Sequence, residues 1–260
     1  MSLGKLTLIP LGLCMVLGAG PATAGVTFTA ATRATSTSRM PARLVNSVVR
    51  GSVDGERGRF EFQEGSFAPG AGTVLLTQDG GREVRFYDPA FEKCGKWAAR
   101  RAKAARSLAS RSFASLKIAK TLDEAGAEIV GLPTRHLRFL LTYDETPPSG
   151  KAIQRWRVER TDDLWLSAEP HDAALAVWLA PRPPMLDGAE LDRRIAEAMK
   201  EATGVLLKRS TVETRRLADK EPESITTTLE VTSLETSAEL PPDAFVEPFL
   251  CKMPSADERR

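Results

Sequence analysis

The chain contains few of the residues from which metal sites and nucleophilic active sites are usually built. Among its 260 residues are two histidines, His136 and His171, and three cysteines. Neither histidine has a second histidine at metal-ligand spacing, and no C-x-x-C pair occurs. A G-x-S-x-G elbow is also missing, so a hydrolase of that type has no support in the sequence. We therefore expect no catalytic residue, no metal and no cofactor.

Two adjacent acids, Asp162 and Asp163 in RTDDLWLS, are the remaining candidates for catalysis. Paired carboxylates can divide acid and base roles between them. Two acids at a tight turn between strands are nevertheless explained by turn chemistry, and we assign them to such a turn. His136 lies on the strand face opposite Leu137, which predicts a solvated histidine, and His171 falls in an expected turn. We therefore do not expect the protein to be an enzyme.

The sequence also lacks an apolar run long enough to cross a bilayer. The run from Leu6 to Leu17 covers about twelve residues, against roughly twenty for a membrane-spanning helix. It follows Lys5 and precedes Ala22-Thr23-Ala24, which is the order of a cleaved Sec-type secretory signal. Cys14 follows Leu13, whereas the residue before a lipidated cysteine is normally small, so we favour cleavage after Ala24. We expect an exported, soluble, periplasmic protein.

Acidic residues are absent from residues 94–120, CGKWAARRAKAARSLASRSFASLKIAK, which contain eight Lys or Arg. Export argues against a nucleic-acid partner, and the chain as a whole carries a formal charge of only +2. We expect a helix over Phe91–Leu122 whose apolar stripe is mostly alanine. Two interpretations of its basic face stay open, a solvated surface and a contact with anionic lipid headgroups. The face is formed by Lys96, Arg100, Lys103 and Arg111.

Alternation of apolar and charged residues predicts a series of short antiparallel strands with one wet face. Phe60 and Phe62 flank Glu61 in this way. The turn Asp79-Gly80-Gly81 within TVLLTQDGGREVRFY predicts the clearest hairpin. A second helix is expected from Gly188 to Ala202. Its apolar stripe would consist of Leu191, Ile195 and Met199.

These patterns divide the chain into four parts. Residues 1–24 are the signal peptide, and residues 25–43, rich in Ala, Thr and Ser, are expected to be a flexible lead whose beginning could pair as a short strand. Residues 44–254 form one domain of about eight to eleven strands and two helices. Residues 255–260 are a disordered tail.

The order of these elements resembles the periplasmic lipoprotein-sorting (LolA/LolB-like) superfamily, and in particular its uncharacterised members. The resemblance spans Leu44 to Pro254, and its most telling piece is LPPDAFVEP at residues 240–248. The other segments that carry it are GRFEF, LLTQDGGREVRFYDP, GAEIVGLPTRHLRFLLTY, RWRVERTDDLWLS, TGVLLKRSTVE and TTTLEVTSLET. It implies an α+β fold, a curved antiparallel half-barrel whose concave face is covered by two helices and, in several members, holds acyl chains.

The resemblance therefore implies a non-enzymatic carrier or binding protein for a lipid or a lipid-modified partner. The alternative is a structural or regulatory envelope protein that presents the same fold to a protein partner. Alternation tells which residues share a face but not which face is concave, so an open cavity and a filled core both stay open. The expected cavity residues are Phe60, Phe62, Val84, Phe86, Leu137, Phe139, Leu141, Trp156 and Val158. The expected lid residues are Leu191, Ile195 and Met199.

Cleavage after Ala24 leaves two cysteines, Cys94 and Cys251, in a compartment that permits disulfides. We predict that they form a disulfide, which would stabilise the fold by up to about 5 kcal/mol because it closes a long loop. Thiol quantification in unreduced, denatured protein should then find no reactive thiol in the exported chain. Two reactive thiols per chain would contradict the bridge.

Overall fold

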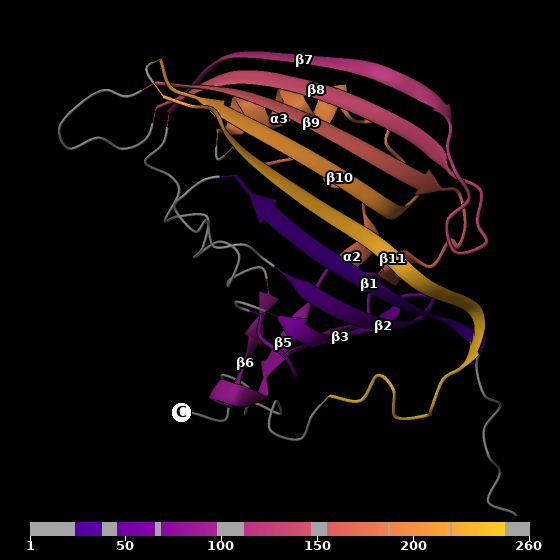
Figure 1. The fold of residues 1–260 in the computed structure, drawn as a ribbon. Helices are drawn as coiled ribbons and strands as arrows, with labels where there is room; N and C mark the ends of the chain where they lie inside the picture. The colour runs from indigo at the N-terminus through magenta and orange to yellow at the C-terminus, as the bar shows by residue number, and fades with distance from the viewer. Residues whose placement is uncertain are drawn as a thin grey trace, which may run out of the picture.

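The computed structural model describes residues 24–37, 46–65, 69–97, 112–146, 155–186, 188–218 and 220–247. These residues form a single sheet of eleven antiparallel strands (Figure 1). The strands are β1 (Ala24–Ser36), β2 (Ser47–Asp54), β3 (Arg57–Gly65), β4 (Val74–Thr77), β5 (Arg85–Asp88), β6 (Lys93–Lys96), β7 (Ser112–Ala125), β8 (Arg135–Thr146), β9 (Trp156–Ser167), β10 (Val205–Arg216) and β11 (Glu223–Glu239). The helices are α2 (Ala176–Leu179), α3 (Ala189–Ala198) and the short 3-10 helices Pro89–Phe91 and Ala173–Leu175.

The strand order is β6-β5-β4-β3-β2-β1-β11-β10-β9-β8-β7. Each half of the sheet is therefore a meander in which consecutive strands are neighbours, the commonest arrangement for short connections. The two meanders are joined by β1 and β11, which pair from Ala24 opposite Glu239 to Ser36 opposite Ile225. Because β6 and β7 end the order without pairing to each other, the sheet is open.

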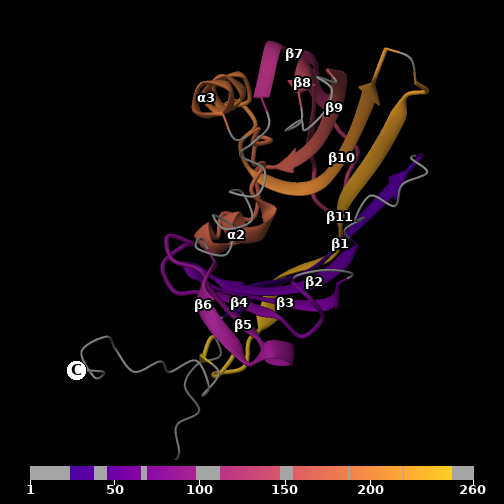
Figure 2. The same ribbon diagram turned by 90° about the vertical axis from the view of Figure 1, so that its left-hand side faces the viewer.

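The sheet is strongly curved, and the helices lie on its concave side (Figure 2). α2 packs on the N-terminal half, where Phe28, Phe60 and Leu179 belong to one buried apolar cluster. α3 packs on the C-terminal half, where Phe139 and Ile195 belong to a second one. Each such side chain contributes about 1.5–3 kcal/mol when it is fully buried, so the concave face supplies most of the apolar burial of the fold.

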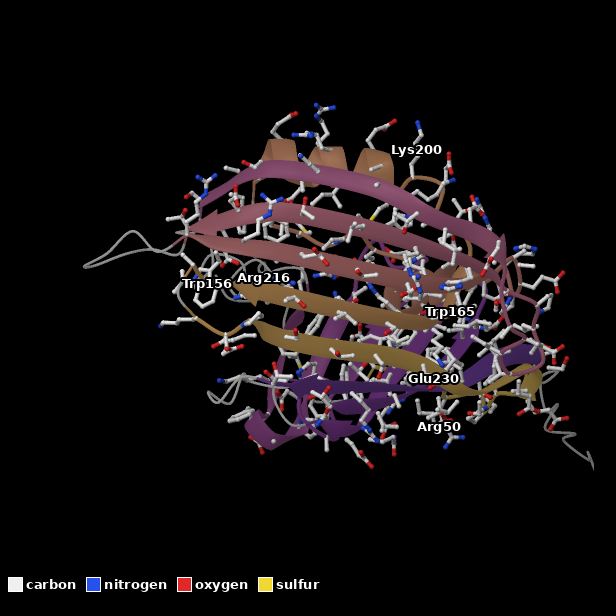
Figure 3. The ribbon with its side chains drawn as sticks, turned by 45° about the horizontal axis from the view of Figure 1, so that its top comes forward. Arg50, Trp156, Trp165, Lys200, Arg216 and Glu230 are labelled. Atoms are coloured by element: carbon white, nitrogen blue, oxygen red, sulfur yellow. The ribbon has the colours of Figure 1, made fainter. Side chains whose placement is uncertain are left out.

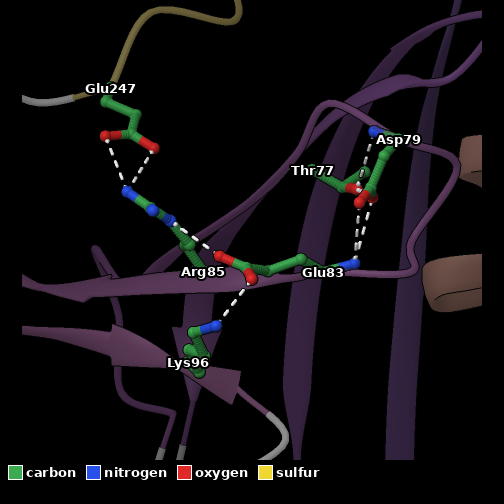
Figure 4. Close-up of polar contacts among 6 residues, drawn as sticks. All are labelled: Thr77, Asp79, Glu83, Arg85, Lys96 and Glu247. Carbon is green, nitrogen blue, oxygen red and sulfur yellow. Dashed lines mark hydrogen bonds and ion pairs between the residues drawn. The ribbon is translucent and has the colours of Figure 1, made fainter.

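The hairpin predicted around Asp79-Gly80-Gly81 is confirmed, between β4 and β5 (Figure 4). The Asp79 carboxylate accepts hydrogen bonds from the backbone N–H of Glu83 at 3.0 and 3.1 Å, and the hydroxyl of Thr77 accepts one from Gly81 at 2.9 Å. Gly80 and Gly81 have φ angles of 69° and 91°, a left-handed conformation that favours glycine. The sequence of the turn therefore supplies both what the hydrogen bonds need, in Thr77 and Asp79, and what the backbone needs, in the two glycines.

The helix expected over Phe91–Leu122 is wrong at both ends of this range, although Trp97, the last described residue before residue 112, is helical. Lys93–Lys96 is β6 and Ser112–Ala125 is β7, while residues 98–111 lie outside the described residues. The apolar spacing from Phe113 to Leu116 mimics a helix because a bulge interrupts the register between Ala114 and Lys117. A three-residue step in a bulged strand thus places both side chains toward the second apolar cluster.

The flexible lead expected over residues 25–43 also needs correction, because Ala24–Ser36 is a strand of 13 residues. It lies between β2 and β11 and pairs with both. Val26, Phe28 and Ala30 alternate toward the core and are buried to within 3% exposure. The local sequence does not reveal this strand, because its many Ala and Thr residues give no strong apolar pattern. The segment forms a strand because it packs and pairs with β2 and β11 on either side.

The second expected helix is confirmed as α3, which begins after Gly188 and ends at Ala198. Residues 240–247, the described part of the closing LPPDAFVEP segment, run from the end of β11 to the β4–β5 hairpin (Figure 1). Phe245 is buried, the Arg57 guanidinium lies 4.9 Å from its ring centroid, and Gln78 donates a hydrogen bond of 2.8 Å to its carbonyl. The segment thus fastens the last residues of the domain to the β4–β5 hairpin, where Arg85 pairs with Glu247 at 3.0 Å (Figure 4).

The burial of β1 predicts that a truncation in it will be strongly destabilising. Phe28 is 2% exposed and its ring centroid lies 6.1 Å from that of Phe60. Phe28→Ala should lower the free energy of unfolding by about 3–5 kcal/mol, measured by urea denaturation. The matched control is Phe91→Ala, because Phe91 is 67% exposed, and it should change the value by less than about 0.5 kcal/mol. Equal effects would contradict a structural role for residues 24–36.

Candidate functional site on the concave face

The twelve residues predicted as cavity and lid lie in the two apolar clusters between the helices and the sheet. Those under α2 are Phe60, Phe62, Val84 and Phe86. Those under α3 are Leu137, Phe139, Leu141, Trp156 and Val158 from the sheet, and Leu191, Ile195 and Met199 from the helix. Leu137, Phe139 and Ile195 are each 0% exposed, so α3 and the sheet are in close contact. The structure thus brings sheet and lid residues together under α3, and leaves the opening of a cavity as a prediction.

A row of charged side chains crosses the same concave face, and we call it the ionic row. It contains Glu145 from β8, Arg160 and Asp162 from β9, and Arg209, Glu213 and Arg215 from β10. Three arginines face three acids, so the row is neutral as a set. Asp162 and Glu145 are among the buried charged residues, at 0% and 3% exposure. Burial of this many charges is unusual, because an ionised group costs several kcal/mol to desolvate unless it is paired.

Asp162 is the centre of the ionic row. Its carboxylate lies 3.0 Å from both Arg160 Nε and Arg209 Nη2, and it accepts a further hydrogen bond from the Thr211 hydroxyl. Burial alone would raise the pKa of Asp162, but Arg209 and Arg160 outweigh burial and hold that pKa below its ordinary value. Asp162 therefore stays ionised at neutral pH.

The rest of the row continues toward the far ends of the strands. Arg160 lies 3.5 Å from Glu213, Glu213 accepts a hydrogen bond of 2.9 Å from Arg215 Nε, and Arg215 lies 3.7 Å from Glu145. Tyr143 is buried beside this chain, and burial followed by the charge of Glu213 raises the pKa of its phenol. The row is thus one connected network and not a set of separate pairs.

The turn assigned to Asp162 and Asp163 is wrong, because both residues lie in the middle of β9. They point to opposite faces: Asp162 joins the ionic row, whereas Asp163 accepts hydrogen bonds of 2.7 Å from His136 Nε2 and 2.8 Å from Arg138 Nε. The signal for this was present in the sequence, since Arg160 and Asp162 continue the alternation that Val158 begins. Two polar residues on an otherwise apolar strand face, here Arg160 and Asp162, are as consistent with a buried polar site within the strand as with a turn between strands.

His136 lies on the convex face, as its alternation with Leu137 predicts. It is less solvated than expected, because its ring stacks on Trp165 with centroids 4.2 Å apart and its side chain is 12% exposed. His171 is exposed in the loop before the 3-10 helix Ala173–Leu175, in agreement with the predicted turn. No cluster of three or more His, Cys, Asp or Glu side chains in the described parts of the chain has the arrangement of a metal site.

A hollow of about 400 Å³ opens beside the ionic row. Four strands contribute to it, and its lining residues are Thr32, Arg160, Arg209, Thr211, Glu213, Ile225, Thr227 and Leu229. Arg209 Nη2 is buried there and, although close to Asp162, has no acceptor aligned for a hydrogen bond. Guanidinium donors and hydroxyls beside Ile225 and Leu229 suit a guest with both a polar and an apolar part.

Comparisons with known proteins leave the family open: no family model and no curated protein matches the chain. A solved structure described as lipid–protein interactions in lipovitellin resembles it over 91% of this chain, with 10% sequence identity and a TM-score of 0.31. The chain spans 28% of the lipovitellin chain. At these values the likeness carries no argument about family or function.

Several predicted features fall partly or wholly outside the described residues. Lys96 lies in β6 and pairs with Glu83 at 2.7 Å, whereas Arg100, Lys103 and Arg111 of the expected basic face are not described. Cys94 lies in β6 and Cys251 is not described, so the disulfide stays a prediction. Residues 1–23 and 248–260, with most of the signal peptide and the tail, are outside as well. Among the described helices, none is long and apolar enough to span a membrane.

Neutralising Asp162, the centre of the ionic row, should have a large effect on the free energy of unfolding. Asp162→Asn leaves Arg160 and Arg209 without their shared carboxylate, and should lower the free energy of unfolding by about 3–5 kcal/mol at pH 7. Glu159→Gln, the same change at an exposed position of β9, is the matched control and should cost less than about 0.5 kcal/mol.

The same variant has a predicted pH dependence. The lowered pKa of Asp162 means that its contribution is present above the ordinary value of 3.8 and is lost as the pH falls through the folded-state pKa. Denaturation curves of wild type and Asp162→Asn should therefore converge as the pH is lowered below that value. A constant difference across the acid range would contradict the assignment of the effect to this carboxylate.

Proposed function

We propose that the protein is a non-enzymatic binding protein or carrier, of the lipoprotein-sorting type that its sequence resembles, for a lipid or a lipid-modified partner. The guest would lie on the concave face beneath α3. The observation that carries this proposal is that an apolar face of β8 and β9 is covered by one helix of ten residues. A cover this small can be displaced without breaking the pairing of the strands beneath it.

The described polar attachments of α3 to the sheet lie in the middle of the helix and just beyond its C-terminal end. At its C-terminal end, Glu201 pairs with Lys120 at 2.5 Å and its carbonyl accepts a hydrogen bond from Arg135 at 3.3 Å. Within the helix, Arg194 donates to the carbonyl of Leu116 at 3.2 Å. Exposed ion pairs contribute about 0–1 kcal/mol each, so apolar contact holds the helix more than these bonds do.

The free energies of opening and of lipid binding are comparable. Ile195 and Met199 are the two fully covered side chains of the lid, and uncovering both costs about 3–6 kcal/mol. An acyl chain gains about 0.8 kcal/mol for each methylene that it buries, so about four to eight methylenes offset the loss. The polar end of such a guest would reach the hollow beside the ionic row, where Arg160 and Arg209 present donors.

The second candidate is a structural or regulatory envelope protein that uses the same fold to bind a protein partner. The complete burial of Leu137 and Phe139 beneath α3 favours this candidate, because a packed core requires no guest. Organic extraction and mass spectrometry of protein purified without detergent separate the two. Stoichiometric acyl species support the carrier, and their absence from repeated preparations supports the second candidate.

If α3 is a lid, substitutions on its buried and exposed sides should have different effects on lipid affinity. Met199 is 3% exposed and faces the sheet, whereas Lys200 is exposed. Met199→Ala should weaken the closed state, raise the population of the open one, and tighten binding of a fluorescent dodecanoic acid by about tenfold. Lys200→Ala is the control and should leave the affinity unchanged. Equal affinities of the two variants would contradict the lid, and absence of binding to the wild type would contradict the carrier.

A further inference from the structure

A second group of cations lies on the convex face, where β8 and β10 end and β9 begins. The strand register places Asp144 opposite Arg157, and Arg157 opposite Arg216, so these three side chains form a cross-strand row. Arg155 immediately precedes β9, and Lys220 lies in the connection between β10 and β11. Figure 3 labels Arg216 at the end of β10. Five charged residues thus meet at one corner of the sheet.

Charge in this corner is not balanced. Asp144 pairs with Arg155 at 2.6 Å and with Arg157 at 3.7 Å. A hydrogen bond from Ser115, followed by the pair with Arg155, lowers the pKa of Asp144, so the carboxylate is already ionised and engaged. Neither Arg216 nor Lys220 forms an ion pair with another residue that the structure describes. Among the described residues that line this corner, four cations and one carboxylate leave a formal charge of +3.

The register makes this imbalance costly. Arg157 and Arg216 are direct cross-strand neighbours, and like charges in that relation destabilise a sheet. Glu223 does not relieve it, since Glu223 pairs in register with Arg215, whose side chain points to the concave face. Glu221 follows Lys220 but does not line the hollow described next. Asp219, next to Lys220 in the sequence, lies outside the described residues. A bound anion would remove the repulsion that the described residues leave uncompensated.

The four cations and Asp144 surround an open hollow of about 640 Å³. Its remaining lining is small and apolar, and consists of Leu217, Ala218 and Pro222. Guanidinium groups bind phosphate oxygens through two parallel hydrogen bonds, and a lysine adds a mobile point charge. From this geometry we infer that the corner is a binding site for a phosphate group, and we call it the basic hollow.

The basic hollow is separate from the concave site. Arg215 and Arg216 are consecutive residues of β10, so their side chains point to opposite faces of the sheet: Arg215 joins the ionic row and Arg216 lines the basic hollow. Phosphate binding at the hollow requires neither an acyl chain nor movement of α3. The inference therefore holds or fails independently of the proposed function.

Inorganic phosphate is the first probe, with affinity measured by calorimetry or by backbone amide shifts at low ionic strength. Binding should be saturable and should weaken as salt is added. Arg216→Ala should weaken it by about tenfold, the loss of one charge-assisted hydrogen bond. The matched control is Arg82→Ala, because Arg82 is an exposed arginine on the β4–β5 hairpin, and it should leave the affinity unchanged.

A second arm identifies where the phosphate comes from. Vesicles of phosphatidylglycerol and of phosphatidylcholine are compared by co-sedimentation with wild type, Arg216→Ala and Arg82→Ala. Retention on phosphatidylglycerol that Arg216→Ala reduces identifies a lipid headgroup as the ligand. Binding of inorganic phosphate without vesicle retention identifies a soluble phosphate. Absence of both, or equal effects of Arg216→Ala and Arg82→Ala, overturns the inference.

Discussion

The pairing of β1 with β11 makes one continuous sheet out of two halves. It joins two meanders, each of which would otherwise leave a long strand with an unpaired edge. The pairing extends along most of both strands, which have 13 and 17 residues, and bulge-like register shifts interrupt it between Gly25 and Thr27 and between Thr29 and Ala30. Bulges increase the local twist, so the pairing of β1 with β11 both joins the two halves of the sheet and adds to the bend between them.

The curvature that follows places two apolar clusters on one face and gives each its own helix. On β8, β9 and β10, which also carry side chains of the second cluster, the ionic row occupies positions that an apolar side chain could fill. Buried ion pairs are weak evidence for stability, because their desolvation offsets much of their attraction. Asp162 tolerates its position because Arg160 and Arg209 approach it from two strands, and the hollow beside them keeps one guanidinium donor without an aligned acceptor.

The two candidate sites use the same property of a strand, the alternation of side chains between faces. At one end of β10 this alternation sends Arg215 into the concave network and Arg216 to the convex surface. If both proposals hold, the guest site and the phosphate site lie on opposite faces of the same strands. A carrier bound to an anionic surface through the basic hollow would then hold its guest close to that surface. That arrangement requires both proposals, which are tested separately.

Features that depend on neighbours along the chain could be predicted from the sequence. The β4–β5 hairpin follows from Asp79-Gly80-Gly81, α3 from the spacing of Leu191, Ile195 and Met199, and the shared faces of β3, β8 and β9 from alternation. A local pattern contains the information for each of these, because a period of two or of 3.6 residues is visible within a few residues.

Features that depend on partners far away in the chain could not be predicted from local patterns and become visible only in the folded protein. β1 is a strand because β11, about two hundred residues later, covers its edge. β7 is a strand because β8 pairs with it across a bulge whose spacing imitates a helix. Asp162 belongs to a buried network because Arg209, from another strand, supplies a second charge. The sequence does not show whether a carboxylate is buried, because burial depends on the strands packed around it. The register that brings a cation to the carboxylate is fixed only when the sheet forms.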